Sequence, residues 1–230
     1  TKIGTASVTI SRTGYTGDLG FEIFVPADDA IAVLDAVLDA GAGHGIRPYG
    51  EEALLIARIE AGLLLIDSEF GSSRLAYTDQ DRFTPKELGL TWMLRGIEDD
   101  DRPFIGRDAI RRELAGNTTR WAMTGVVLAW RDYDRLHTEV GLIPPKDPTP
   151  QPYESMVYDA DADDRIGYAT TLMYSPVLQR HIGLARVLPA YAAPGTDVTV
   201  EITIDHVYQR VQARTARLPL FNPERKTAVL

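Results

Sequence analysis

A carboxylate and a guanidinium lie where the neighbouring residues predict apolar side chains. Glu22 stands in the strand-like run GFEIFV and shares a strand face with Phe24. Arg58 stands in the run LLIARIEAG and shares a helix face with Leu54 and Leu55. If both faces of the strand are covered, Glu22 is at least partly buried and needs donors, and Arg58 needs an acceptor. The two groups form either an internal ion pair that stabilises the fold or part of a binding site.

A tryptophan is the third residue that invites a functional interpretation. Trp92 alternates with Leu90 and Leu94, which is a strand-like pattern. Its indole is either part of the apolar core or a flat wall on which an aromatic ligand could stack.

An acidic triplet imitates the start of a calcium-binding loop. Asp159, Asp161 and Asp163 have the spacing of the first three ligands. However, Asp164 stands where the sharp turn needs glycine, and Thr170 stands where the bidentate glutamate belongs. The segment is therefore predicted to be a solvated hairpin tip. The histidines form no pair at metal-ligand spacing and there is no nucleophile-elbow serine, so metal and hydrolase chemistry have no support.

The composition excludes several classes of protein. The 230 residues carry a net charge of −9, which argues against a nucleic-acid partner. The absence of cysteine excludes disulfides and thiolate metal sites and fits a reducing compartment, so a cytoplasmic location is expected. The longest aliphatic run, 63–66, is far too short to span a membrane. With 44% hydrophobic residues the chain can bury a substantial core.

The first half of the chain reads as an α/β unit. Two short strands are predicted at 6–11 and 20–25, joined by a glycine-rich turn. Helices are predicted from Asp28 to Gly41, from Gly50 to Ala61 with Gly62 ending it, and near 107–114.

The second half reads as a small antiparallel barrel or sandwich. From Trp121 onward a helical period is almost absent, and runs at 125–129, 167–171 and 182–187 are typical of strands. The clearest strand is 198–204, and a turn at Asp205-His206 could join it to a second run at 207–218. The change of character predicts an α+β fold with two parts, 1–117 and 118–230.

Several segments resemble, in the right order, motifs of the glycine-cleavage T-protein (aminomethyltransferase) family. In the first half these are SRTGYTGDLGFEI (11–23), similar to GYTGE-x-GFEI; ARIEAG (57–62), similar to LRLEAG; TPKELGLTW (84–92), similar to TP-x-E-x-GL-x-W; and FIGR (104–107). In the second half the pairs and runs SP (175–176), IGLA (182–185) and LPLF (218–221) resemble the family's barrel motifs. The resemblance implies that 1–117 is the C-terminal part of a folate-binding domain and 118–230 is a C-terminal β-barrel domain.

The resemblance also implies a cofactor and a site. Family members bind tetrahydrofolate between their domains and transfer a one-carbon group to or from its N5. By position, Glu22 would read the pterin ring, because its two acceptors suit two parallel N–H donors. Tyr15 would line the same pocket, Arg58 would donate to the folate, and Trp92 would stack on it. Such a site needs no metal.

Two departures from the family pattern bear on function. Family members carry a long segment before this point, including an aspartate at the reacting centre. No catalytic residue is therefore expected in this chain, which we interpret as the C-terminal part of an enzyme whose N-terminal part is its partner. The loop 67–83 is longer than in glycine-cleavage members and lacks their short acidic segment. This difference favours the folate-dependent demethylases, which take methyl groups from small-molecule donors.

Two other functions are compatible with the same sequence. The chain could be a non-catalytic folate-binding or regulatory relative, since a shared fold does not carry function by itself. It could also be the folate-binding tail of a flavin amine dehydrogenase, which an upstream dinucleotide fingerprint would reveal. Arg210, Arg214 and Arg217 either help to hold the folate's glutamate tail or form a solvated strand face.

Overall fold

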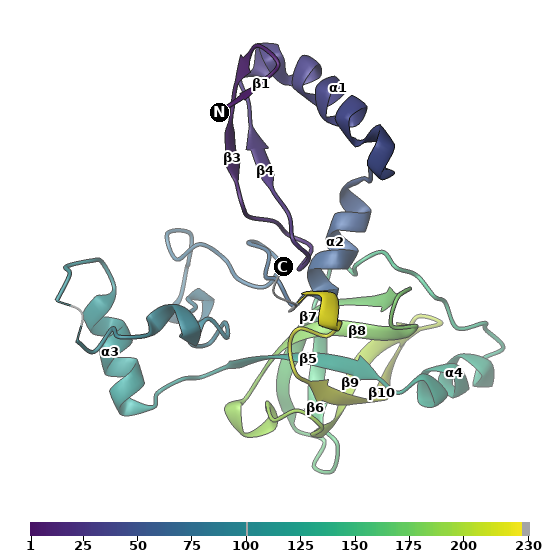
Figure 1. Cartoon of the computed structure of the whole chain (residues 1–230). Helices are drawn as coiled ribbons and strands as arrows, with labels where there is room; N and C mark the ends of the chain where they lie inside the picture. Colours follow the sequence, from purple (N-terminus) through teal and green to yellow (C-terminus); the bar gives the residue numbers. More distant parts are fainter. Residues whose placement is uncertain (100, 227–230) are drawn as a thin grey trace.

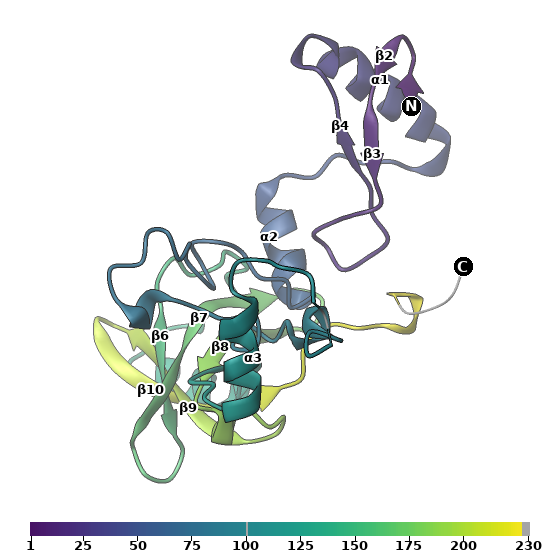
Figure 2. The same ribbon diagram turned by 90° about the vertical axis from the view of Figure 1, so that its left-hand side faces the viewer.

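A closed antiparallel barrel forms the second half of the chain, and a unit of hairpins and helices precedes it (Figure 1). The computed structural model describes residues 1–99 and 101–226. Figures 1 and 2 both show the first hairpins and helix projecting away from the barrel, with a second helix leading back to it. The α+β fold class predicted from the sequence is confirmed. Of the two architectures predicted for the second half, barrel and sandwich, the structure has the closed barrel.

The barrel has the strand order β10-β5-β8-β7-β6-β9, closed by pairing of β9 with β10. Its strands are β5 (Ala122–Leu128), β6 (Ser155–Asp159), β7 (Arg165–Ser175), β8 (Arg180–Val187), β9 (Asp197–Ile204) and β10 (Val207–Ala216). Closure leaves no free sheet edge. The even positions of β9 are buried and its odd positions are not, as the alternation predicts.

A two-residue turn joins β9 to β10, as the sequence predicts. Asp205 and His206 both have positive φ, at 48° and 63°, and Ile204 pairs with Val207 across the turn. Two central residues with positive φ match the right-handed twist of the strands they connect. The acidic triplet that begins at Asp159 also lies in a hairpin tip, between β6 and β7.

Helix α4 (Trp130–Glu139) corrects the expectation that helical periodicity is nearly absent after Trp121. Tyr133, Leu136 and His137 lie on its buried face, and the first two join the core of the barrel. The centroid of the Tyr133 ring lies 4.3 Å from that of His137 and 4.2 Å from that of His181. The helix carries only a narrow apolar stripe among charged residues, which is why its period is easy to miss.

The first half contains two small hairpins and three helices among the residues described. The elements are β1 (Lys2–Ile3), β2 (Ala6–Ser7), β3 (Thr9–Ser11), β4 (Glu22–Phe24), α1 (Ala30–Gly41), α2 (Glu51–Glu60) and α3 (Arg107–Gly116). β1 pairs with β2, and β3 pairs with β4. The remaining one-turn 3₁₀ helices are 27–29, 42–44, 79–81, 91–94, 189–191 and 224–226. None of these described helices is long and apolar enough to cross a membrane.

Helix α2 fastens the first half to the barrel. Its Ile59 is fully buried against Met173, Ile182 and Leu184 on the outer face of β7 and β8. The Ser175 hydroxyl donates a 2.6 Å hydrogen bond to the buried carboxylate of Glu60. Apolar burial gives this junction its stability, and the paired carboxylate gives it a fixed register.

A second buried carboxylate links the loop after α2 to the segment that leads into the first barrel strand. Glu87, 1% exposed, accepts hydrogen bonds from the Arg120 side chain and backbone at 2.9 to 3.2 Å and from the Thr84 N–H at 3.2 Å. Burial by itself raises the pKa of Glu87, but the donors outweigh it, so the pKa lies below its ordinary value of 4.5.

Loss of this pair makes the stability of the fold less sensitive to acid. Because the folded-state pKa of Glu87 is lowered, its contribution is present above pH 4.5 and disappears as the pH falls through the folded value. We expect Arg120→Ala to lower the free energy of unfolding at pH 7 by about 1–3 kcal/mol. The free energy of unfolding should then differ less between pH 7 and pH 3.5 than it does in the wild type. Urea unfolding at both pH values measures this, with the exposed Arg82→Ala as control; an unchanged acid sensitivity would contradict the assignment.

Candidate functional site

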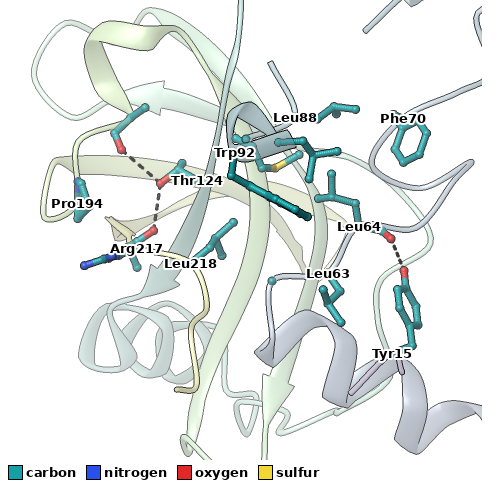
Figure 3. Close-up of a pocket in the computed structure, with 16 residues that line it drawn as sticks. Tyr15, Leu63, Leu64, Phe70, Leu88, Trp92, Thr124, Pro194, Arg217 and Leu218 are labelled. Atoms are coloured by element: carbon teal, nitrogen blue, oxygen red, sulfur yellow. Dashed lines mark hydrogen bonds between the residues drawn. The ribbon is translucent and has the colours of Figure 1, made fainter. Parts of the chain in front are cut away.

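A cavity of about 600 Å³ opens where the first half of the chain meets the barrel (Figure 3). Its lining is mostly apolar and comes from the loops after α2 and before β5, from β5 itself and from the end of β10. Three aromatic rings lie in its wall, those of Tyr15, Phe70 and Trp92. The volume and lining suit an organic ligand with a flat ring system.

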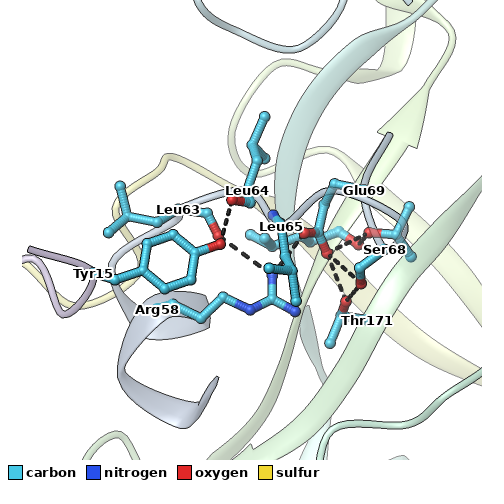
Figure 4. Close-up of polar contacts among 10 residues, drawn as sticks. Tyr15, Arg58, Leu63, Leu64, Leu65, Ser68, Glu69 and Thr171 are labelled. Atoms are coloured by element: carbon cyan, nitrogen blue, oxygen red, sulfur yellow. Dashed lines mark hydrogen bonds and ion pairs between the residues drawn. The ribbon is translucent and has the colours of Figure 1, made fainter. Parts of the chain in front are cut away.

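Tyr15 is half-buried, and its hydroxyl donates a short hydrogen bond to the carbonyl of Leu64 (Figure 4). Burial raises the pKa of the Tyr15 phenol, the nearby Arg58 opposes the rise, and Glu69 adds to it. The phenol is therefore neutral at physiological pH, where it can donate a hydrogen bond.

The C-terminal segment holds the loop that carries Tyr15. The Lys226 ammonium lies 3.6 Å from the Asp18 carboxylate and 3.4 Å from the Thr16 carbonyl. Arg225 lies 3.3 Å from the same carboxylate, and the Phe221 N–H donates to the Glu60 carbonyl at 2.8 Å. A segment more than two hundred residues away in sequence thus fixes one wall of the cavity.

Trp92 is 64% exposed and belongs to a 3₁₀ turn, 91–94, so the interpretation as a core tryptophan is wrong. The turn breaks the alternation with Leu90 and Leu94 that suggested a strand, because Leu90 precedes the turn and Leu94 ends it. Instead, the indole lines the cavity (Figure 3), and its exposed surface is available to a ligand.

Arg58 is buried, as the sequence predicts, but its partner is not Glu22. Its Nη1 donates to the Glu69 carboxylate at 2.6 Å and to the Leu63 carbonyl at 3.3 Å (Figure 4). The alternative of an internal Glu22–Arg58 pair is therefore wrong. Arg58 also lies outside the lining of the cavity, behind the 63–65 turn.

Glu22 is exposed, contrary to the expectation of partial burial. All three residues of β4 are exposed, because among the described residues β4 is paired only with β3 and neither face is covered. The Thr13 hydroxyl donates a short hydrogen bond to the Glu22 carboxylate. The glutamate thus stands beside the loop that carries Tyr15 but does not line the cavity.

The structure separates the three arginines near the end of the barrel. Arg210 pairs with Asp163 and lies over the Tyr158 ring, and Arg214 pairs with Asp197 at 2.6 Å. Arg217 alone of the three lines the cavity, beside Leu218. Its positive charge gives the otherwise apolar cavity an anion-attracting edge.

Sequence analysis missed Glu69, which is fully buried under the cavity wall. It lies in the polar loop 67–83, and two of its partners, Thr170 and Thr171, are more than one hundred positions away. No local pattern marks such a residue. No group of three or more potential metal ligands occurs among the residues with a described position.

These features define a class: a protein in which a closed barrel and an α/β part share an aromatic-walled cavity. Residues 1–96 match the family model "GCVT N-terminal domain", and residues 138–222 match "Glycine cleavage T-protein C-terminal barrel domain". The chain belongs to the glycine cleavage T-protein family.

Relatives of known name span a range of activities. The chain is 36% identical over 218 residues to a trimethylamine-oxide aldolase of Ruegeria pomeroyi, covering 95% of this chain and 24% of that protein. It is 32% identical over 202 residues to an aminomethyltransferase of Caldanaerobacter subterraneus, covering 87% and 45%. The crystal structure of aminomethyltransferase T from Bartonella henselae superposes with a TM-score of 0.70 at 22% identity, covering 92% of this chain and 49% of that one. The chain thus spans half or less of these relatives' length.

Proposed function

We propose that this chain is the C-terminal part of a tetrahydrofolate-dependent one-carbon transferase, which moves a methyl or aminomethyl group to or from folate N5. The observation that carries the proposal is the cavity itself, whose aromatic wall and Arg217 edge suit a flat pterin with an anionic tail. Aminomethyltransferases among the relatives support it. The cysteine-free sequence supports a cytoplasmic location.

In this proposal each cavity residue binds or orients the folate. Trp92 stacks on a ring face, and Tyr15 keeps a neutral hydroxyl at the wall. Bound folate supplies a nucleophilic nitrogen, N5, and the protein's contribution is to hold it in place and exclude water. Two further residues act without lining the cavity. In the proposal Glu22 meets the pterin edge from the adjoining hairpin once the N-terminal part covers β4, and Arg58 acts through the 63–65 turn. No described residue of this chain is assigned a catalytic proton transfer.

The N-terminal part of the enzyme packs, in this proposal, on the hairpin and helix that project from the barrel. Phe21 and Phe24 are about 60% exposed, Ile31 is 71% exposed and Leu34 is 52% exposed. Several large apolar side chains exposed on adjoining elements suit an interaction surface. A segment seated there would also cover the open face of β4 and bury Glu22 next to its ligand.

The one-carbon donor is a small molecule in the proposal. The relatives carry two named activities, trimethylamine-oxide aldolase and aminomethyltransferase. The loop 67–83 is longer than in glycine-cleavage members, and this difference favours donors other than an aminomethylated carrier protein. A methylated amine, sulfonium or aryl ether fits a demethylase-like member of the family.

Transfer assays test the proposal. The chain is completed with the segment that precedes it in longer relatives, then incubated with tetrahydrofolate and a panel of methylated amines, sulfonium compounds and aryl ethers. We expect 5-methyltetrahydrofolate and the demethylated donor to appear with at least one donor, and we expect Glu22→Gln to weaken folate binding by more than about 1 kcal/mol. Folate binding without any transfer would instead favour a non-catalytic relative, and a protein that neither binds nor transfers would contradict the proposal.

Arg214, near the end of β10, and Arg217, which directly follows the strand, are suited to a paired comparison. We expect Arg217→Ala to weaken tetrahydrofolate binding about two- to fivefold, because an exposed charge pair is worth little in water. The loss should shrink at high salt. Arg214→Ala should leave the affinity unchanged, because its guanidinium pairs with Asp197 away from the cavity. Titration calorimetry at two salt concentrations checks this; equal effects of the two variants would remove Arg217 from the site.

A further inference from the structure

Glu69 is a fully buried carboxylate whose two oxygens are both saturated with donors (Figure 4). One oxygen accepts from the Arg58 guanidinium at 2.6 Å and from the Leu65 N–H at 2.7 Å. The other accepts from the hydroxyls of Ser68, Thr170 and Thr171, at 3.2, 3.1 and 2.6 Å. A buried carboxylate is stable only when it is paired and hydrogen-bonded in this way.

The donors come from separate parts of the fold. Arg58 belongs to α2, Leu65 and Ser68 to the segment that follows it, and the two threonines to barrel strand β7. The hydroxyl of Ser68 also lies 3.2 Å from that of Thr171. Glu69 therefore ties helix, loop and barrel together at one point, and any movement between them breaks a charged hydrogen bond.

The backbone held by this cluster is the wall of the cavity. Leu63 and Leu64 line it, and Leu64 offers the carbonyl that accepts from Tyr15. Arg58 fixes the carbonyl of Leu63, and Glu69 fixes the N–H of Leu65. Hydrogen bonds thus hold the backbone groups before and after the Leu64 carbonyl, and so fix its position.

We infer that Glu69 is a positioning residue of the cavity: through Arg58 and the 63–65 turn it sets the Tyr15 hydroxyl relative to the barrel. That the cavity's ligand is tetrahydrofolate rests on the proposed function; the geometric role of Glu69 does not. Arg58 accordingly acts on the ligand through the turn, since it pairs with Glu69 and lies outside the cavity lining.

A matched carboxylate separates positioning from a merely structural role. Asp132 accepts from Arg135 at 2.7 Å and from the Gln212 N–H at 2.8 Å, so it also ties a helix to a barrel strand. It does not line or border the cavity. Glu69→Gln and Asp132→Asn are therefore the same chemical change, an acid to its amide at a helix–barrel junction, at a fully buried and at a partly exposed position.

The test measures backbone hydrogen exchange, melting temperature and tetrahydrofolate affinity in both variants. We expect Glu69→Gln to speed exchange across 62–66 by about tenfold or more, whereas Asp132→Asn leaves that segment unchanged. Folate affinity should fall about tenfold in Glu69→Gln relative to Asp132→Asn. If Glu69→Gln does not fold, Thr171→Val removes a single donor and should produce the same local exchange change in smaller measure.

The outcomes are distinguishable from failure of the proposed function. If the wild-type chain binds no folate, the exchange measurement alone still decides the role of Glu69. If exchange across 62–66 is equal in the two variants once their stabilities are matched, Glu69 is only a structural tie and the inference is overturned. If local exchange rises but folate affinity is unchanged, the turn does not set the site, which also overturns it.

Discussion

Replacing Trp92 with alanine is expected to weaken tetrahydrofolate binding about tenfold or more, because stacking of a heterocycle on an aromatic side chain is worth roughly 1–3 kcal/mol. The indole lines the cavity and is 64% exposed, so it contributes little to the core. The melting temperature should therefore stay within a few degrees of wild type. A loss of affinity with retained stability is the signature of a ligand-contacting residue.

The neighbouring Met93 is the control for this prediction. Its side chain is 61% exposed on the same 3₁₀ turn but does not line the cavity. Titration calorimetry of Trp92→Ala, Trp92→Phe and Met93→Ala should rank the affinities, with the phenylalanine variant between wild type and alanine. If Trp92→Ala binds as tightly as Met93→Ala, the indole is not part of the folate site.

The largest effect on stability is expected from Gly167→Ala in β7. A Cβ atom at this position would lie 2.0 Å from the Arg186 carbonyl oxygen and 2.7 Å from the Cα of Val187. Both are backbone atoms of the paired strand β8, so no side chain can move aside to relieve the clash. Prying the two strands apart in a closed barrel should cost about 3 kcal/mol or more.

Gly43→Ala provides the comparison, because a Cβ there meets nothing within 4 Å. We expect its free energy of unfolding to equal or slightly exceed that of wild type, by up to about 1 kcal/mol. Urea denaturation of both variants measures the difference. A Gly167→Ala protein as stable as Gly43→Ala would show that β7 and β8 do not approach as closely as the structure places them.

The parts of the fold with strict local patterns could be predicted from the sequence. Alternation in 198–204 and the turn at Asp205-His206 predicted the β9–β10 hairpin, and Gly62, with φ of +69°, ends α2 as expected. Helix α4 was missed because its apolar stripe is narrow and lies between strands. Local periodicity reports an element only when one of its faces is broadly apolar.

The site was only partly predictable, because its decisive contacts are long-range. Tyr15 and Trp92 were placed in one pocket through the family resemblance, and the structure brings both to one cavity. The partner of Arg58 was misassigned, since nothing local distinguishes Glu69 from the other acids of its loop. Glu22 was expected to be covered, but coverage depends on what packs against β4 and not on its own alternation.

The measurement that tests the central claim most directly is a calorimetric titration of tetrahydrofolate into this chain and into the chain extended with the segment that precedes the matching part in longer relatives. The account predicts saturable binding of one folate per chain, tighter when the upstream segment is present and weakened by Trp92→Ala in both forms. Absence of binding in both forms, or binding that Trp92→Ala leaves unchanged, would contradict the claim that the cavity between helix α2 and the barrel is a folate site.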